Sequence, residues 1–236
     1  MEKSVCFLIA AGPHIHPNFL LSMDMTIEVL HKLGIRYNKL YCAGYFLESI
    51  RGKLVRDFLK LDYENAFFID TDQEFSPMSV LTLLEIPVDI VAGVPPFKKL
   101  PESYPVDLMM RDGQLTGAKV GENLAILQAG YLGTGFLRIR RQALEKMTKA
   151  YESLLVHEFP DEEPWVDLFG RLIKDGWKFG EDKSFSERWS ALGGKLWVYP
   201  NINFVHWDGH TAYHGNLHKH LLKKKEEQDH VLLPLL

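Results

Sequence analysis

The chain has 236 residues, of which 46% are hydrophobic and 25% are charged, and its formal net charge is −4. This length is enough for one large domain, and the mild acidity argues against a general nucleic-acid-binding protein, which would show a basic face. Cys6 and Cys42 are too few for a disulfide framework, and no stretch is as long as a transmembrane helix. We therefore expect a cytoplasmic protein without stable membrane insertion.

The first part of the chain predicts alternating strands and helices. An apolar run at 4–10 predicts a strand, and an amphipathic pattern at 17–33 predicts a helix. The following elements are expected as a strand at 36–42, a helix at 47–61, a strand at 66–69, a helix at 77–84 and a strand at 89–92. This alternation predicts an α/β fold with a mostly parallel, nucleotide-binding sheet flanked by helices.

The second part predicts a smaller mixed or antiparallel portion. Segments 106–110 and 125–128, with a turn at 111–114, suggest a hairpin or mixed sheet. The later elements are expected as strands at 136–139 and 195–198 and as helices at 142–155, 163–175, 183–192 and 216–229. We expect one domain over 1–215, with a C-terminal helix and tail over 216–236 packed on it.

The most informative motif is Asp70-Thr71-Asp72, which follows the apolar strand at 66–69. Ligands of open α/β sheets bind beyond the carboxyl ends of the strands, so both carboxylates are expected where a substrate binds. Carboxylate oxygens suit Mg²⁺ or Mn²⁺, and Mg²⁺ usually takes one or two of them plus phosphate oxygens from its substrate. The alternative is a cap for the helix that begins near Pro77. The buried strand in front of the motif favours a ligand site.

Arg51 is a further candidate for contact with a diphosphate, and a glycine-rich turn is a candidate for contact with a ligand. An arginine can bind phosphate oxygens bidentately, although a solvated helix face is an equally good explanation of Arg51. In Gly133-Thr134-Gly135, the glycines allow close approach of the backbone and Thr134 offers a hydroxyl and an amide. The alternative is a bulged turn between strands. The glycine spacing does not match a dinucleotide-binding fingerprint.

Acidic residues and histidines gather toward the C-terminus. Glu181 and Asp182 precede the helix at 183–192, where they either stabilise its start or hold and deprotonate an incoming hydroxyl. His206, His210 and His214 fall within nine residues, which suggests a metal ligand among them. Their spacing does not identify the metal.

In this order, the motifs resemble those of the GT-A class of nucleotide-sugar glycosyltransferases. The resemblance covers about residues 4–215 and rests on Asp70-Thr71-Asp72 with Pro77, Gly133-Thr134-Gly135-Phe136 with Arg140-Arg141, Gly180-Glu181-Asp182, and His206 before Gly209. It implies that Asp70 and Asp72 contact the metal and the donor's ribose and diphosphate. It also implies that His206 completes the metal site and that Glu181-Asp182 faces the acceptor. Similar enzymes often have one residue between that His and Gly, but two intervene here, which leaves His210 as the alternative ligand.

The predicted function is transfer of a sugar from a UDP- or GDP-linked donor to a hydroxyl acceptor, with Mn²⁺ or Mg²⁺ as cofactor. A divalent cation would neutralise the charge that the leaving diphosphate gains. One alternative is a sugar-nucleotide nucleotidyltransferase, but residues 11–16 lack the glycine-rich basic loop expected after the first strand. Another is a non-catalytic nucleotide-sugar-binding scaffold. The base, the sugar and the class of acceptor stay open.

Overall fold

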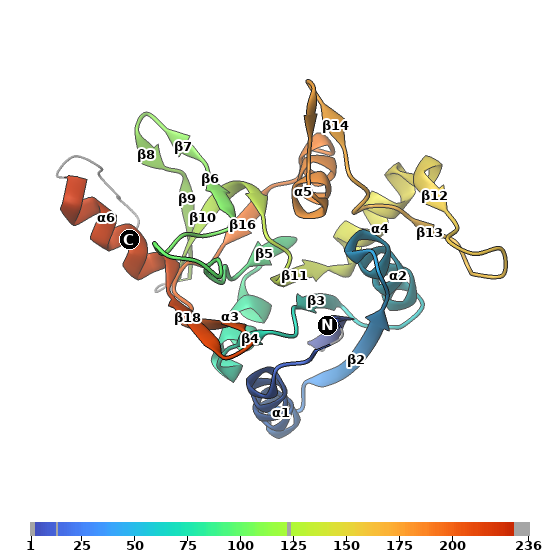
Figure 1. Cartoon of the computed structure of the whole chain (residues 1–236), viewed down its shortest axis with the longest axis horizontal. Helices are drawn as coiled ribbons and strands as arrows, with labels where there is room; N and C mark the ends of the chain where they lie inside the picture. Colours follow the sequence, from blue (N-terminus) through green and yellow to red (C-terminus); the bar gives the residue numbers. More distant parts are fainter. Residues whose placement is uncertain (1–2, 13, 122–123, 229–236) are drawn as a thin grey trace.

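The computed structural model describes residues 3–12, 14–121 and 124–228, without the side chains of 226–228. It has an α/β fold, with a mixed central sheet flanked by helices and with small antiparallel sheets (Figure 1). The helices are α1 (Pro17–Lys32), α2 (Leu47–Leu59), α3 (Pro77–Glu85), α4 (Arg141–Ala150), α5 (Glu181–Ala191) and α6 (Leu217–Gln228), with a 3-10 turn at Glu152–Leu154.

The central sheet of the described chain has nine strands in the order β2-β1-β3-β11-β5-β16-β10-β6, with β9 beside β10. They are β1 (Ser4–Ala11), β2 (Arg36–Ala43), β3 (Asn65–Ile69), β5 (Ile90–Ala92), β6 (Val106–Leu108), β9 (Gly117–Val120), β10 (Leu124–Leu132), β11 (Phe136–Arg140) and β16 (Leu196–Val198). Strands β11 and β10 run against their neighbours, and the others share one direction. The predicted fold class, with its mixed portion, is therefore confirmed.

The short strands form small sheets around the central one. They are β4 (Gln73–Glu74), β7 (Met110–Arg111), β8 (Gln114–Leu115), β12 (Leu155–Val156), β13 (Trp165–Val166), β14 (Ile173–Lys174), β15 (Trp177–Lys178), β17 (Phe204–Asp208) and β18 (Thr211–Gly215). The sheet β18-β17-β4 begins directly after the Asp70-Thr71-Asp72 motif, because β4 starts at Gln73. The predicted turn at 111–114 is confirmed as the β7–β8 hairpin.

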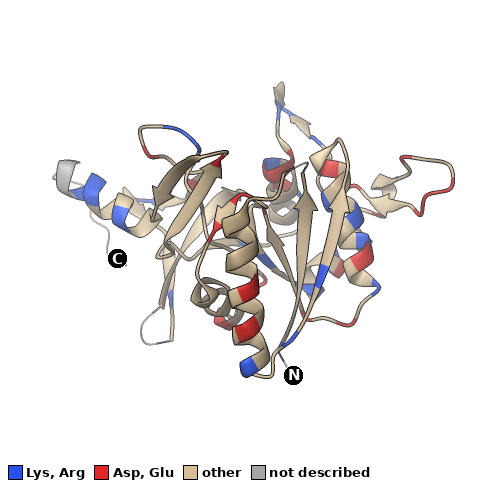
Figure 2. Cartoon of the chain, turned by 60° about the horizontal axis from the view of Figure 1, so that its bottom comes forward, with Lys and Arg blue, Asp and Glu red and all other residues tan. Residues whose placement is uncertain are grey.

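Two hydrophobic clusters cover the two faces of the sheet. On β1, Val5 and Phe7 pack in one cluster with side chains of α1 and α3, whereas Cys6 and Leu8 pack in the other with α2, α4 and α5. This division follows from the alternation of side chains along a strand. Charges of both signs are interspersed over the helices and loops (Figure 2). No helix in the described ranges is long and apolar enough to cross a membrane.

A buried arginine joins the centre of the sheet to the end of α3. Arg138 on β11 is fully buried, and its guanidinium donates to the backbone carbonyls of Leu83, Ile86, Val88 and Asp89. Burial lowers the pKa of Arg138 to about 9, with the nearby charge of Arg140 contributing. These bonds satisfy carbonyls in the last turn of α3 and directly after it, so we assign Arg138 a structural role.

The helix predicted over 163–175 is wrong. Apolar residues at 165, 168, 169 and 172 have helical spacing, but the segment forms β13, a loop and the start of the β14–β15 hairpin. Asp175 and Gly176 close this hairpin with φ values of 52° and 79°, which favours the turn over a helix. Arg188 Nη1 donates to the carbonyls of Leu168 and Gly170 at 2.9 and 2.7 Å, so backbone groups in the loop are satisfied without a helix.

The C-terminal helix packs on the same core as the sheet. Leu217 of α6 is buried in the cluster that covers the α2 face, and Leu221 packs against that cluster. Residues 229–236 of the predicted tail lie outside the described residues.

Candidate functional site

The Asp70-Thr71-Asp72 motif lies at the carboxyl end of β3, as predicted, and the glycine-rich turn lies beside it. Phe136 at the start of β11 pairs with Ile69, and the Asp70 amide donates to the Gly135 carbonyl at 2.9 Å. Thr71 ties the motif to the loop after β1: its carbonyl accepts from the His16 amide at 2.9 Å, and its hydroxyl donates to the His14 carbonyl at 3.3 Å. Three chain segments therefore meet at this strand end.

The first part of the site is an acidic cluster around Arg51, made up of Arg51, Asp70, Glu181 and Asp182. Arg51 Nη1 lies 3.0 Å from Glu181 Oε1 and 2.8 Å from Asp182 Oδ1, and Nη2 lies 3.4 Å from Asp70 Oδ1. The Arg51 side chain is only 2% exposed, whereas its three partners are partly open to solvent. The structure thus brings together four predicted site residues from α2, β3 and α5. Both Nη atoms of Arg51 are already occupied by carboxylates.

The charges in this cluster perturb the ionisation of Arg51 and Asp182. Burial alone would lower the pKa of Arg51, but the three carboxylates raise it above its ordinary value. Burial raises the pKa of Asp182, while the charge of Arg51 opposes this rise. Thr134 also holds Asp182, because its hydroxyl and its amide donate to Oδ1. All hydrogen bonds to Asp182 from the described residues reach Oδ1, so Oδ2 is available to a ligand.

Gly135 is required by close packing against the motif. A Cβ atom at this position would lie 2.6 Å from Asp70 Oδ2 and 2.4 Å from Gln73 Nε2. Both distances are too short for contact, so a side chain here would displace the Asp70 carboxylate. The structure therefore explains Gly135 by the lack of room for a side chain at this position. Gly133 has more room, with 3.2 Å from its Cβ position to the Pro105 ring.

The second part of the site contains Asp72, His206 and Lys98. His206 Nε2 lies 3.3 Å from Asp72 Oδ1, and Lys98 Nζ lies 2.5 Å from Asp72 Oδ2. His206 reaches Asp72 because β17 pairs with β4, opposite Gln73, and the Trp207 amide donates to the Asp72 carbonyl at 2.8 Å. Burial would raise the pKa of Asp72, but a protonated His206 and the Lys98 ammonium bring it below its usual value.

The facing atoms of Asp72 and His206 fit a bound cation. His206 Nδ1 lies 2.7 Å from the Pro96 carbonyl and donates to it, so a neutral His206 presents the lone pair of Nε2 to Asp72. Asp72 Oδ1 is buried and has no hydrogen-bond partner among the described residues. Two acceptors facing each other require a cation or a proton between them. The described residues contain no group of three or more His, Cys, Asp or Glu side chains that could hold a metal, so further ligands would have to come from substrate and water.

The other predicted histidines, and Lys53 on the helix that carries Arg51, lie elsewhere. His210 is exposed in the turn between β17 and β18. His214 lies on β18, where it pairs with Val205 of β17. Lys53 forms ion pairs with Glu158 and Glu162, away from the motif. Among the predicted histidines, His206 is the one that the structure brings beside Asp72.

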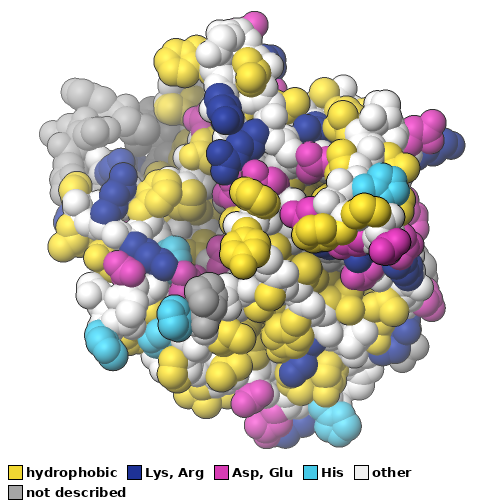
Figure 3. Space-filling view, turned by 45° about the vertical axis from the view of Figure 1, so that its right-hand side comes forward, with side chains coloured by type: hydrophobic (Ala, Val, Ile, Leu, Met, Phe, Trp, Pro, Cys, Tyr) yellow, Lys and Arg dark blue, Asp and Glu magenta, His cyan; other side chains and the backbone are white. Residues whose placement is uncertain are grey.

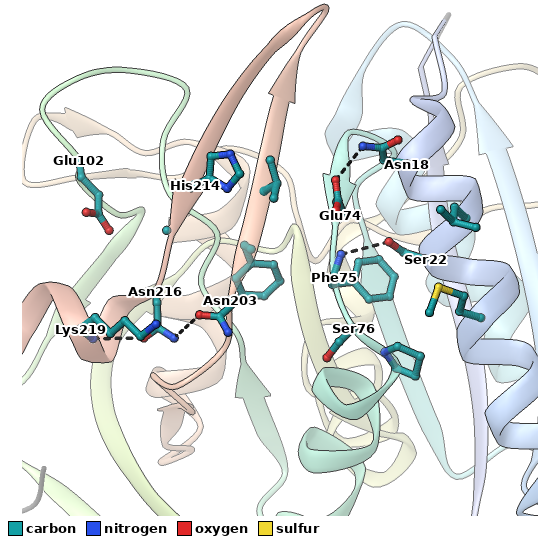
Figure 4. Close-up of a pocket in the computed structure, with 16 residues that line it drawn as sticks. Asn18, Ser22, Glu74, Phe75, Ser76, Glu102, Asn203, His214, Asn216 and Lys219 are labelled. Atoms are coloured by element: carbon teal, nitrogen blue, oxygen red, sulfur yellow. Dashed lines mark hydrogen bonds between the residues drawn. The ribbon is translucent and has the colours of Figure 1, made fainter.

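A pocket lies on the other face of the small sheet. Val205 pairs with Glu74 and His214, and these three residues line a cavity of about 620 Å³. His206, the next residue, points to the opposite face because side chains alternate along a strand. Figure 4 shows Asn203, Asn216 and Lys219 on one side of this pocket and Asn18 and Ser22 on the other. The pocket is therefore distinct from the Asp72 site.

Exposed apolar side chains occur on several loops at the carboxyl ends of the strands. Tyr45 and Phe46 follow β2 and are strongly exposed, as is Leu100 in the loop after β5. Figure 3 shows hydrophobic and acidic side chains next to each other on one face. Trp207 is held in place, since its ring stacks on that of His16 at 4.5 Å between centroids.

Sequence reasoning missed Lys98 and the β17–β18 hairpin that carries His206. Lys98 follows β5, whose carboxyl end also faces the ligand edge of the sheet, and this position was the available signal. The hairpin signal was Asp208-Gly209 between alternating residues.

No protein-family model and no curated protein matches this chain. Its structure is similar to that of A197 from STIV, with 18% identity and a TM-score of 0.50 over 87% of this chain and 86% of that chain. It is also similar to a mutant Drosophila β-1,4-galactosyltransferase 7 in complex with manganese, UDP-Gal and xylobiose (14% identity, TM-score 0.46, 96% and 75% covered). A third similar structure is the inositol-1-phosphate CTP transferase from T. maritima (12% identity, TM-score 0.45, 96% and 97% covered). The first similarity is evidence for the fold alone, and the other two, with TM-scores below 0.5, add nothing to it.

Proposed function

We propose that this chain is a glycosyltransferase that moves a sugar from a nucleoside-diphosphate sugar to a hydroxyl acceptor. The observation that carries this proposal is that the buried Asp72 Oδ1 has no hydrogen-bond partner among the described residues and faces His206 Nε2 at 3.3 Å, next to the cluster around Arg51. A cation site and a group of carboxylates beside it are what transfer from a diphosphate to a hydroxyl needs. We also propose that residues 1–215 form the catalytic domain.

Of the predicted metal ligands Asp70, Asp72 and His206, the last two face each other and would hold Mn²⁺ or Mg²⁺, whereas Asp70 is paired with Arg51. When bound, the ion supplies Lewis-acid stabilisation of the leaving diphosphate. Asp70, the first residue of the motif, would face the donor. The backbone of the Gly133-Thr134-Gly135 turn would contact the donor beside Asp70. Because the Arg51 side chain is buried and its guanidinium pairs with three carboxylates, Arg51 would act on the donor indirectly, by holding these carboxylates in place.

Asp182 is the proposed base for the acceptor. Its Oδ1 is bound by Arg51 and Thr134, which fixes the orientation of the carboxylate and leaves Oδ2 to accept a proton. Its raised pKa favours proton transfer, since a base is most effective when its pKa lies near the working pH. Glu181 forms an ion pair with the same Arg51 guanidinium and would orient the acceptor.

The nucleotidyltransferase alternative lacks a basic residue where the reaction needs one. Residues 11–16, which begin at the last residue of β1, contain no Lys or Arg. His16 in this loop accepts a hydrogen bond from the Asn18 amide at 3.3 Å and so caps α1. This loop therefore gives no support to triphosphate binding.

The proposal is tested by calorimetric titration of UDP- and GDP-sugars into the chain, with Mn²⁺ or with EDTA. We expect binding that requires the cation and that His206→Ala weakens by at least tenfold. His214→Ala is the matched control, because His214 lies on the opposite face of the same sheet, and it should bind like the wild type. Equal affinity in Mn²⁺ and EDTA, or equal affinity of both variants, would contradict the proposed cation site.

A further inference from the structure

Lys98 lies at the centre of the site but has no role so far. It belongs to the segment between β5 and β6, and its Nζ donates to Asp72 Oδ2 at 2.5 Å. The same segment is fixed at a second point, where the Pro96 carbonyl accepts from His206 Nδ1 at 2.7 Å. These two contacts hold Lys98 in a defined position against the motif.

The two oxygens of Asp72 have different partners. Oδ2 binds the Lys98 ammonium, while Oδ1 faces His206 without a hydrogen bond from any described residue. A cation on Oδ1 and the ammonium on Oδ2 are therefore compatible with one carboxylate. Two positive charges would then meet at the same end of β3.

The Lys98 ammonium also has donors to spare. An ammonium group has three N–H donors, and Asp72 is its only partner among the described residues. The side chain is 31% exposed, so the remaining donors can reach a ligand. Neighbouring Lys99 instead extends over the Phe97 ring, 4.8 Å from its centroid.

We propose that Lys98 binds the diphosphate of the donor and stabilises it as it leaves; this inference rests on the proposed function. In the transfer, the bond between the anomeric carbon and the diphosphate oxygen breaks, and its electron pair stays on that oxygen. The acceptor oxygen bonds to the anomeric carbon, and its proton goes to Asp182. The charge that develops on the diphosphate lies within reach of the Lys98 donors, where a preorganised cation is most effective.

The test compares Lys98→Met with Lys99→Met, which removes an equal charge from the next residue. Affinities for UDP and GDP are measured by calorimetry at a Mn²⁺ concentration that saturates each variant. We expect Lys98→Met to lose about 10- to 100-fold in affinity, the usual effect of one charge-assisted hydrogen bond. Lys99→Met should change it less than about twofold, and Lys98→Arg should restore part of the loss. Circular dichroism of each variant checks that the fold is kept.

The outcomes separate this inference from the proposed function. If the wild type binds UDP or GDP and Lys98→Met binds it as tightly as Lys99→Met, the role of Lys98 is refuted and the glycosyltransferase proposal stands. If the wild type binds neither nucleotide with Mn²⁺, the proposed function is refuted, and the role of Lys98 with it.

Discussion

Replacement of Arg51 by Met tests the physical basis of the acidic cluster. The variant keeps most of the apolar stem but removes the only cation that contacts Asp70, Glu181 and Asp182 within the described residues. Breaking a buried ion pair by removing one partner costs about 3–5 kcal/mol. The carboxylates here are 36%, 21% and 30% exposed, so solvent screens part of their repulsion. We therefore expect a loss of about 2–3 kcal/mol in the free energy of unfolding at pH 7.5.

The stability of this variant should depend on pH with a definite sign. Without Arg51, the charge that opposes the burial of Asp182 and the charges of Glu181 and Asp70 is lost, so the pKa of Asp182 rises further above its unfolded value. The folded state then binds more protons than the unfolded state, so stability rises relative to wild type as the pH falls through this raised pKa. The deficit caused by Arg51→Met should therefore be smaller at pH 5 than at pH 7.5.

Urea unfolding followed by circular dichroism at both pH values measures these differences. Lys60→Met is a suitable control, because Lys60 follows the same helix and its ion pairs are on the surface; its stability should match the wild type. The reasoning is refuted if Arg51→Met is as stable as the wild type at pH 7.5. It is also refuted if the deficit is the same at pH 5.

Three other substitutions probe separate parts of the structure. Gly135→Ala should weaken binding of a nucleotide sugar by at least tenfold in calorimetry, because its Cβ would lie 2.6 Å from a motif carboxylate, whereas Gly180→Ala enters open space and should bind normally. Arg138→Leu should lose about 3 kcal/mol in urea unfolding, because several buried carbonyls lose their donor; Arg140→Leu, two residues along the same strand, should lose less than about 1 kcal/mol. For sugar transfer, kcat/KM should decrease as the pH falls, beginning above the usual pKa range of an aspartate, since Asp182 must be deprotonated and its pKa is raised. Asp182→Asn should lose this acidic decrease from the pH profile and about 10²–10⁴-fold in rate. An unchanged pH profile would exclude Asp182 as the base.

The sequence predicted the strand end and its carboxylates because local patterns determine them. An apolar run that ends in Asp70-Thr71-Asp72 identifies a buried strand and its carboxyl end without knowledge of the rest of the chain. The contacts of Arg51 with Glu181 and Asp182 span 130 and 131 residues, and only the packing of α2 against the sheet and α5 brings them together. No local pattern encodes such a contact.

Two errors have the same origin. The spacing of apolar residues in 163–175 is helical, yet Arg188 and the Asp175-Gly176 turn, both outside the periodic pattern, favour a loop and a hairpin. Lys98 was not identified from the sequence, since no local pattern distinguishes it from Lys99, and only the pairing of β17 with β4 reveals that it shares Asp72 with His206.

The central claim concerns which bond of a nucleotide sugar this chain breaks. ³¹P NMR of UDP- and GDP-sugars incubated with the chain and Mn²⁺, with and without added pyrophosphate, identifies the phosphorus products directly. The account predicts a nucleoside diphosphate, formed slowly by transfer to water when no acceptor is present, and formed in both conditions. A nucleoside triphosphate and a sugar phosphate, formed only when pyrophosphate is added, would contradict it and identify a nucleotidyltransferase. Tight binding of the nucleotide sugar without any product would contradict it as well, and would leave a binding scaffold.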